Sequence, residues 1–80
     1  MLRSLHHADY QKLRDSLKSM RMKAGVTQVQ MADALGVGQS FVSKIERGES
    51  YVDFFLYVQW CRTCDTSATQ TLKQLLATLE

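Results

Sequence analysis

The chain has 80 residues, 45% of them hydrophobic, and a formal net charge of +2, which fits one small folded domain and argues against a disordered chain. No run of about 18 apolar residues occurs and the start, MLRSLHHADY, has no apolar core, so we expect a cytoplasmic protein without a transmembrane helix or signal peptide. Residues 1–25 hold six basic and two acidic side chains, whereas residues 49–80 hold two basic and four acidic ones, so the N-terminal part suits a polyanionic partner.

The spacing of apolar residues predicts an all-α fold of five helices, with a flexible segment at residues 1–8 and a single domain at residues 9–80. Asp9 is the expected N-cap of a first helix that ends near Ala24, and Gly25 stands where a left-handed C-terminal cap belongs. The apolar positions of this helix follow helical spacing: Tyr10, Leu13, Leu17, Met20 and Ala24.

Residues 27–48 predict two short helices joined by a tight turn. Thr27 and Gln30 fit a capping box that starts the second helix, and Gly36 ends it. Val37 fills the turn, and Gly38 is the N-cap of a third helix at residues 39–47, although Ser or Thr would cap it better. The expected inner residues are Met31, Ala32, Leu35, Val42 and Ile45, and the expected outer ones are Gln39, Ser40, Phe41, Ser43 and Lys44. This spacing is typical of a helix-turn-helix motif, which Gly48 terminates.

Two further helices complete the pattern. Asp53 is expected to cap the fourth, at residues 54–63, with an inner face made of Phe54, Tyr57, Val58, Cys61 and Cys64. The fifth, at residues 68–79, carries an apolar stripe made of Leu72, Leu75, Leu76 and Leu79. Five aromatic residues in or near the fourth helix are more than a small domain can bury, so some are expected to cover a partner: Tyr51, Phe54, Phe55, Tyr57 and Trp60.

Cys61 and Cys64 have the C-x-x-C spacing of some redox and metal sites. Thioredoxin-like chemistry needs a βαβ unit, and no strand pattern is visible. Structural zinc needs four ligands, and the other candidates, His6 and His7, lie far away along the chain. We therefore expect two buried, reduced core cysteines, with no metal and no other cofactor, and a redox switch as the alternative.

The segment at residues 27–48 resembles the XRE, or lambda-repressor-like (Cro/C1-type), helix-turn-helix family. The resemblance is carried by T-Q at 27–28, M-A at 31–32, L-G-V at 35–37, Q-S at 39–40, V-S-K-I at 42–45 and E-R-G at 46–48, preceded by R-x-x-x-G at 21–25. It extends in weaker form over residues 10–79. Gly38 departs from the usual Ser or Thr, and Cys64-Asp65 departs from the common leucine-glycine.

The resemblance implies that the third helix enters the major groove of double-stranded DNA. By position, the base-reading residues are Gln39, Ser40 and Lys44, with Ser43 and Phe41 beside them. Glutamine can pair with adenine and lysine with guanine. The implied phosphate-binding residues are Thr27, Gln28, Arg47 and Gly48, and the implied structural ion pair is Arg21 with Glu46. The alternative for the polar residues is an ordinary solvated surface.

The predicted function is therefore that of a sequence-specific transcriptional regulator, a repressor that binds a palindromic operator as a homodimer through helices four and five. Two alternatives remain open. One is an antitoxin or restriction-modification controller protein of the same fold, with a protein partner on the aromatic face of helix four. The other is a protein-interaction module without DNA binding. No catalytic grouping has usable spacing, so an enzyme is not expected.

Overall fold

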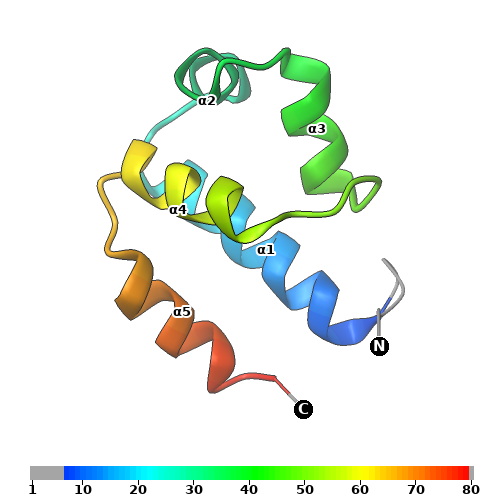
Figure 1. The fold of residues 1–80 in the computed structure, drawn as a ribbon, viewed down its shortest axis with the longest axis vertical. Coiled ribbons are helices and arrows are strands. Elements are labelled where there is room, and N and C mark those ends of the chain that lie inside the picture. Colours follow the sequence, from blue (N-terminus) through cyan, green and yellow to red (C-terminus); the bar gives the residue numbers. More distant parts are fainter. Residues whose placement is uncertain (1–6, 80) are drawn as a thin grey trace.

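Residues 7–79 are described by a computed structural model that contains five α-helices (Figure 1). They are α1 (Ala8–Lys23), α2 (Gln28–Leu35), α3 (Gln39–Arg47), α4 (Phe54–Thr63) and α5 (Ala68–Leu76). No strand occurs within this range, and the predicted five-helix, all-α fold is confirmed. Most of the predicted flexible segment, residues 1–6, lies outside the described residues. Within them, every helix is too short or too polar to cross a bilayer.

The first helix starts earlier than expected. His7, not Asp9, is its N-cap, because the imidazole Nδ1 accepts a hydrogen bond from the Asp9 amide at 3.0 Å. A ring nitrogen thus replaces the oxygen that usually caps a helix, and Asp9 moves into the first turn, where the helix dipole favours a carboxylate. At the other end, Gly25 follows the helix with a φ of +72°, as predicted.

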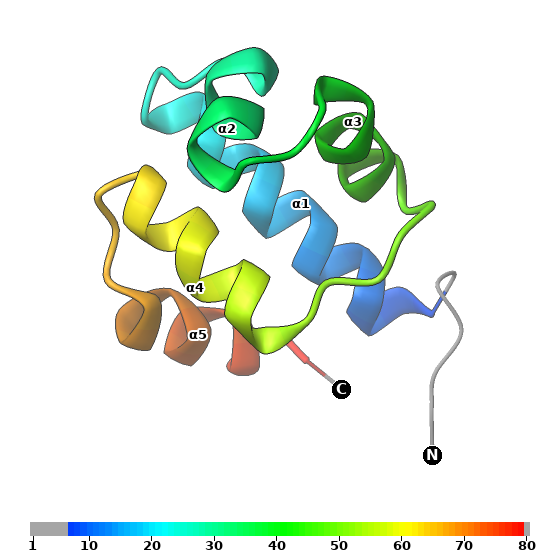
Figure 2. The ribbon, with the colours of Figure 1, turned by 45° about the horizontal axis from the view of Figure 1, so that its top comes forward.

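The helix-turn-helix segment follows its local signals closely. Both halves of the capping box are present, since Thr27 Oγ1 accepts from the Gln30 amide at 3.0 Å and Gln30 Oε1 accepts from the Thr27 amide at 2.9 Å. Gly36 ends α2 with a φ of +72°, and Gly38 caps α3 without a side-chain hydrogen bond. Both views place α2 and α3 at one end of the molecule and α5 at the other (Figure 2).

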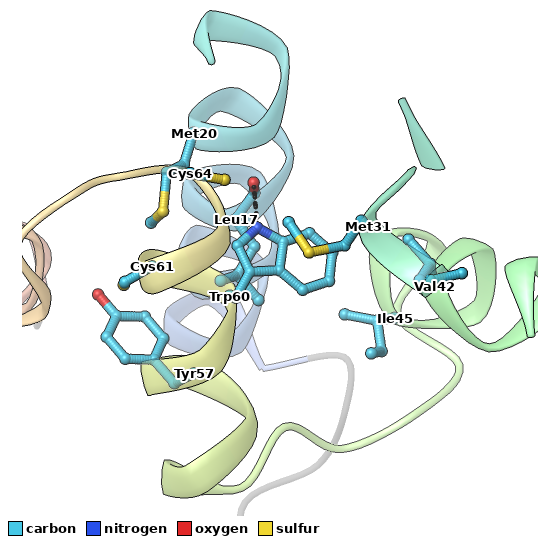
Figure 3. Packing of buried hydrophobic residues seen from close by; sticks show 10 residues of the cluster. Leu17, Met20, Met31, Val42, Ile45, Tyr57, Trp60, Cys61 and Cys64 are labelled. Atoms are coloured by element: carbon cyan, nitrogen blue, oxygen red, sulfur yellow. Dashed lines mark hydrogen bonds between the residues drawn. The ribbon is translucent and has the colours of Figure 1, made fainter. Parts of the chain in front are cut away.

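Trp60 lies at the centre of the hydrophobic core (Figure 3). Its side chain has no exposed area, and its indole N–H donates to the Leu17 carbonyl at 3.0 Å, which ties α4 to α1. The other buried members come from α1, α2, α3 and α4, including the C-cap of α4: Leu17, Met20, Met31, Ala32, Val42, Ile45, Tyr57, Cys61 and Cys64. Both cysteines are free and buried, so their predicted place in the core is confirmed.

The prediction that Phe54 faces the core is wrong, since it is 75% exposed and Trp60 takes the buried place on α4. Phe54 shares a helix face with Tyr57 but stands one turn earlier, at the edge of a shallow groove between α4 and α5. There, the described part of the chain does not cover it.

The leucine stripe of the last helix is also placed differently from the prediction. The buried residue of α5 is Thr71, whereas Leu72 and Leu76 are 36% and 57% exposed. The helix contacts both α1 and α4, and it buries Thr71 there rather than the whole leucine stripe. It ends at Leu76, and Lys12 Nζ donates to the Thr78 carbonyl just beyond its end.

Candidate nucleic-acid interface

The outward face of α3 is a short polar row. Val42 and Ile45 are fully buried, which fixes the rotation of this helix about its axis. The predicted base-reading residues are therefore left on the other side, with Gln39, Ser40 and Lys44 exposed and Ser43 half-buried. Residues four apart lie one turn apart on a helix, so these side chains form a polar strip along the first part of α3.

Phe41 does not lie on this outer face, contrary to the prediction. Its ring is half-buried and packs against the core cluster, beside a shallow hollow that Leu35, Phe55 and Leu56 also line. Phe41 stands four residues before the buried Ile45, about 40° away around the helix, so both side chains lie toward the core. In the structure Phe41 packs against the hydrophobic core.

Arg21 and Glu46 form a largely buried ion pair behind the polar row. Arg21 Nε lies 2.6 Å from Glu46 Oε2 and Nη2 lies 3.0 Å from Oε1, with side-chain exposures of 11% and 4%. The third nitrogen, Nη1, donates to the Val26 carbonyl at 2.9 Å. The hydrogen bonds to Glu46 raise the pKa of Arg21 above its ordinary value, so the guanidinium stays charged.

Gln28 extends this pair into a polar chain that reaches the start of α3. Its Nε2 donates to Glu46 Oε1 at 3.1 Å, and its Oε1 accepts from Gln39 Nε2 at 3.5 Å. One continuous set of contacts thus links α1, α2 and both ends of α3. Sequence reasoning missed the contacts of Gln28 with Glu46 and Gln39, although Gln28 and Gln39 each stand in the first turn of their helices.

Arg47 has partners that the sequence did not suggest. Its Nε and Nη2 donate to the two carboxylate oxygens of Glu49 at 2.8 and 3.3 Å, and its Nη1 donates to Ser43 Oγ. The hydrogen bond and charge of Arg47 hold the pKa of Glu49 below its ordinary value. The left-handed turn at Gly48 brings Glu49 back beside the last turn of α3, which a linear sequence pattern does not reveal.

The family resemblance implies phosphate binding by both Gly48 and Thr27. The Gly48 N–H already donates to the Ile45 carbonyl at 3.1 Å, and the glycine is buried, so its amide caps α3 rather than facing outward. The Arg14 guanidinium lies over it, so close that a Cβ at this position would collide with Arg14 Nη1. Thr27 is exposed, and its hydroxyl, which accepts in the capping box, keeps its hydrogen for donation.

Two apolar surfaces lie away from the polar row. The groove between α4 and α5 is lined by Phe54, Tyr57, Leu72 and Leu76, while Tyr51 and Phe55 are 55% and 71% exposed near the start of α4. Tyr57 itself is buried, and its hydroxyl lies near the Cys61 thiol without a well-formed hydrogen bond. Burial chiefly raises the pKa of this phenol to about 12.

Comparison with known proteins places this geometry in a wider group. The helix-turn-helix domain profile matches residues 12–74. No curated protein sequence matches the chain significantly. Among solved structures, an XRE-family like protein from Pseudomonas syringae pv. tomato str. DC3000 is 40% identical, with a TM-score of 0.85 over 94% of this chain and 92% of that one.

Two other solved structures are similar over nearly the whole chain. The clp gene regulator ClgR from Corynebacterium glutamicum is 25% identical, with a TM-score of 0.77 over 94% of this chain and 97% of that one. A mutant of the restriction-modification controller protein C.Esp1396I is 20% identical, with a TM-score of 0.78 over 89% and 90%, and this likeness concerns the fold alone.

Proposed function

The chain belongs to the XRE (Cro/C1-type) helix-turn-helix family of non-enzymatic DNA-binding transcriptional regulators, and we propose that it represses transcription by occupying a palindromic operator as a homodimer. In this proposal α3 lies in the major groove of each half-site. The single observation that carries it is the polar row of α3, with its first residue, Gln39, held by the chain of contacts from Arg21 through Glu46 and Gln28.

The proposed division of labour follows from the contacts. Gln39, Ser40 and Lys44 read base edges, because all three are exposed on α3 and carry the donors and acceptors that the major groove matches. Ser43 stands in the same row. Thr27 and Arg47 contact phosphates at the two ends of the motif, and Gln28 assists at the N-terminus of α2, where free amides favour an anion. The geometry favours packing and capping roles for Phe41 and Gly48 instead.

The proposed dimer uses the outer surface of α4 and α5. Phe54 and Leu76 are 75% and 57% exposed there, and Leu72 adds to the same groove. An apolar surface of this kind on so small a domain is typical of a protein-protein contact. Two copies joined this way would present their α3 helices to half-sites about 34 Å apart, one turn of the duplex.

A second candidate function is supported by the aromatic surface at the start of α4. Tyr51 and Phe55 are exposed outside the α4–α5 groove, so a different protein can contact them while the homodimer stays intact. An antitoxin or a restriction-modification controller would use the same DNA-binding face with such a partner. A stable complex with a protein encoded beside this chain would favour this candidate over a self-contained repressor.

The test of the proposal is selection of bound duplexes from a random DNA pool, followed by sedimentation of the complex. We expect an enriched palindrome with half-sites about 10–10.5 base pairs apart, bound by two copies. Enrichment of a single, unrepeated half-site would contradict the homodimer. Absence of any enrichment, even at low salt, would contradict DNA binding itself.

A further inference from the structure

The contact between Arg47 and Glu49 stands where the proposed DNA backbone would run. Both side chains are about half exposed, at 53% and 54%. Arg47 is the last residue of α3, and Glu49 follows its C-cap. The carboxylate takes two guanidinium nitrogens side by side, and Ser43 takes a third. Such a two-point contact fixes the plane of the guanidinium as well as its position.

The charges on and just after α3 show which acidic group lies beside the proposed phosphate contact. The helix and the residue after its cap carry two basic side chains, Lys44 and Arg47, and two acidic ones, Glu46 and Glu49. Glu46 is turned inward and is bound by Arg21, so it is only 4% exposed. Glu49 is therefore the acidic group of this segment that meets solvent beside the proposed phosphate contact.

We propose that Glu49 is a specificity-determining residue of the DNA-binding face, which holds Arg47 against Ser43 and thereby withholds it from phosphates of non-cognate DNA. The proposal rests on the DNA-binding function proposed above. Non-specific binding depends almost wholly on cation-phosphate contacts, whereas a cognate site adds base contacts that α3 makes with other residues. A guanidinium held by a carboxylate therefore contributes less to non-specific binding than to binding of the cognate operator.

The experiment compares the chain with the Glu49→Gln variant on two duplexes of equal length: the selected operator and a scrambled version of it. Glutamine keeps the size of the side chain and loses its charge. We expect the variant to bind the scrambled duplex more tightly and to depend more steeply on salt, by about 0.9 in the slope of log K against log salt per protomer. For each protomer that slope corresponds to a gain of about eight-fold at roughly 0.1 M salt, which is about 60-fold for a dimer on one duplex. The operator should gain less, so the ratio of the two affinities should fall.

The same substitution in an Arg47→Ala background is the matched control. If Glu49 acts by holding Arg47, its replacement there should change neither affinity beyond two-fold or so. An equal gain in both backgrounds would overturn the proposal, because Glu49 would then act through its own charge alone. Unchanged binding in the Glu49→Gln variant, or weaker binding to both duplexes, would overturn it as well. Absence of DNA binding by the unmodified chain would instead contradict the proposed function. Thermal unfolding of each variant checks that it is folded.

Discussion

Replacing Glu46 by alanine should remove more stability than the loss of an exposed ion pair would. The carboxylate is 4% exposed and binds both Arg21, which is 11% exposed, and Gln28. Breaking a buried pair from one side costs about 3–5 kcal/mol, because the other charge is left without its partner. Arg21 keeps one bond, to the Val26 carbonyl, so we expect a loss near the lower end, about 3 kcal/mol.

A loss of this size is large for so short a chain. The total stability expected for a domain of this length is about 4–12 kcal/mol, and each lost kcal/mol lowers the Tm by about 4–8 °C. Urea unfolding followed by circular dichroism measures the change directly. A loss below about 1 kcal/mol, as for an exposed ion pair, would refute the reasoning.

A double substitution separates the ion pair from simple packing. Replacing Arg21 by methionine and Glu46 by leucine together removes both charges and keeps apolar volume in the same space. Because neither charge is then stranded, this variant should be more stable than Glu46→Ala alone. If its loss of stability instead equals the sum of the losses measured for Arg21→Met and Glu46→Leu separately, the two residues do not act as a pair.

The remaining predictions concern separate parts of the molecule. Tyr57→Phe should leave the stability at neutral pH unchanged or raise it by up to about 1 kcal/mol, because the lost hydroxyl has no well-formed hydrogen bond. Since folding raises the pKa of this phenol to about 12, the unmodified chain should lose stability as the pH rises from about 10 toward 12, and the variant should lose less in a urea titration across that range. Gly48→Ala should cost at least about 1–2 kcal/mol, because φ is +79° there and the Arg14 guanidinium must also move to make room for the Cβ, whereas Gly38→Ser, at a φ of −80°, should gain a few tenths of a kcal/mol in the same assay. Gln39→Ala should weaken operator binding by about 1–3 kcal/mol and relax the preference at one base pair, as measured by gel shift on single-base variants, and an equal loss on all sequences would contradict base reading. Leu76→Lys should shift sedimentation toward the monomer without unfolding the chain, since this side chain is 57% exposed, and an unchanged mass would place the dimer contact elsewhere.

Local signals in the sequence were sufficient for most of the fold. The capping box of Thr27 with Gln30 and the left-handed glycines at the helix ends depend on neighbouring residues only, so their positions were predicted closely. The exposure of Phe54 and Leu76 was not, because helical periodicity defines an apolar face but not the angle at which a neighbouring helix covers it.

In the candidate site, too, features set by neighbouring residues were predictable and contacts between distant residues were not. The outward position of Gln39 and Lys44 followed from the periodicity of a short helix with two buried residues. The partners of Arg47 did not, since the contact with Glu49 exists only after the left-handed turn at Gly48 folds the chain back on itself. The contact between Gln28 and Gln39 likewise needs two helices in their final arrangement.

The central tryptophan is an intrinsic fluorescent probe of folding. Trp60 is the single tryptophan of the chain, its ring is fully buried, and its N–H is bound to a backbone carbonyl of α1. Its emission maximum should therefore lie at shorter wavelength in the folded chain and move to longer wavelength when the core opens. Because the ring lies in the interior, away from the outward row of α3, added DNA should leave the wavelength of this emission unchanged. One sample can thus report unfolding through intrinsic fluorescence and operator binding through a labelled duplex, without either signal disturbing the other.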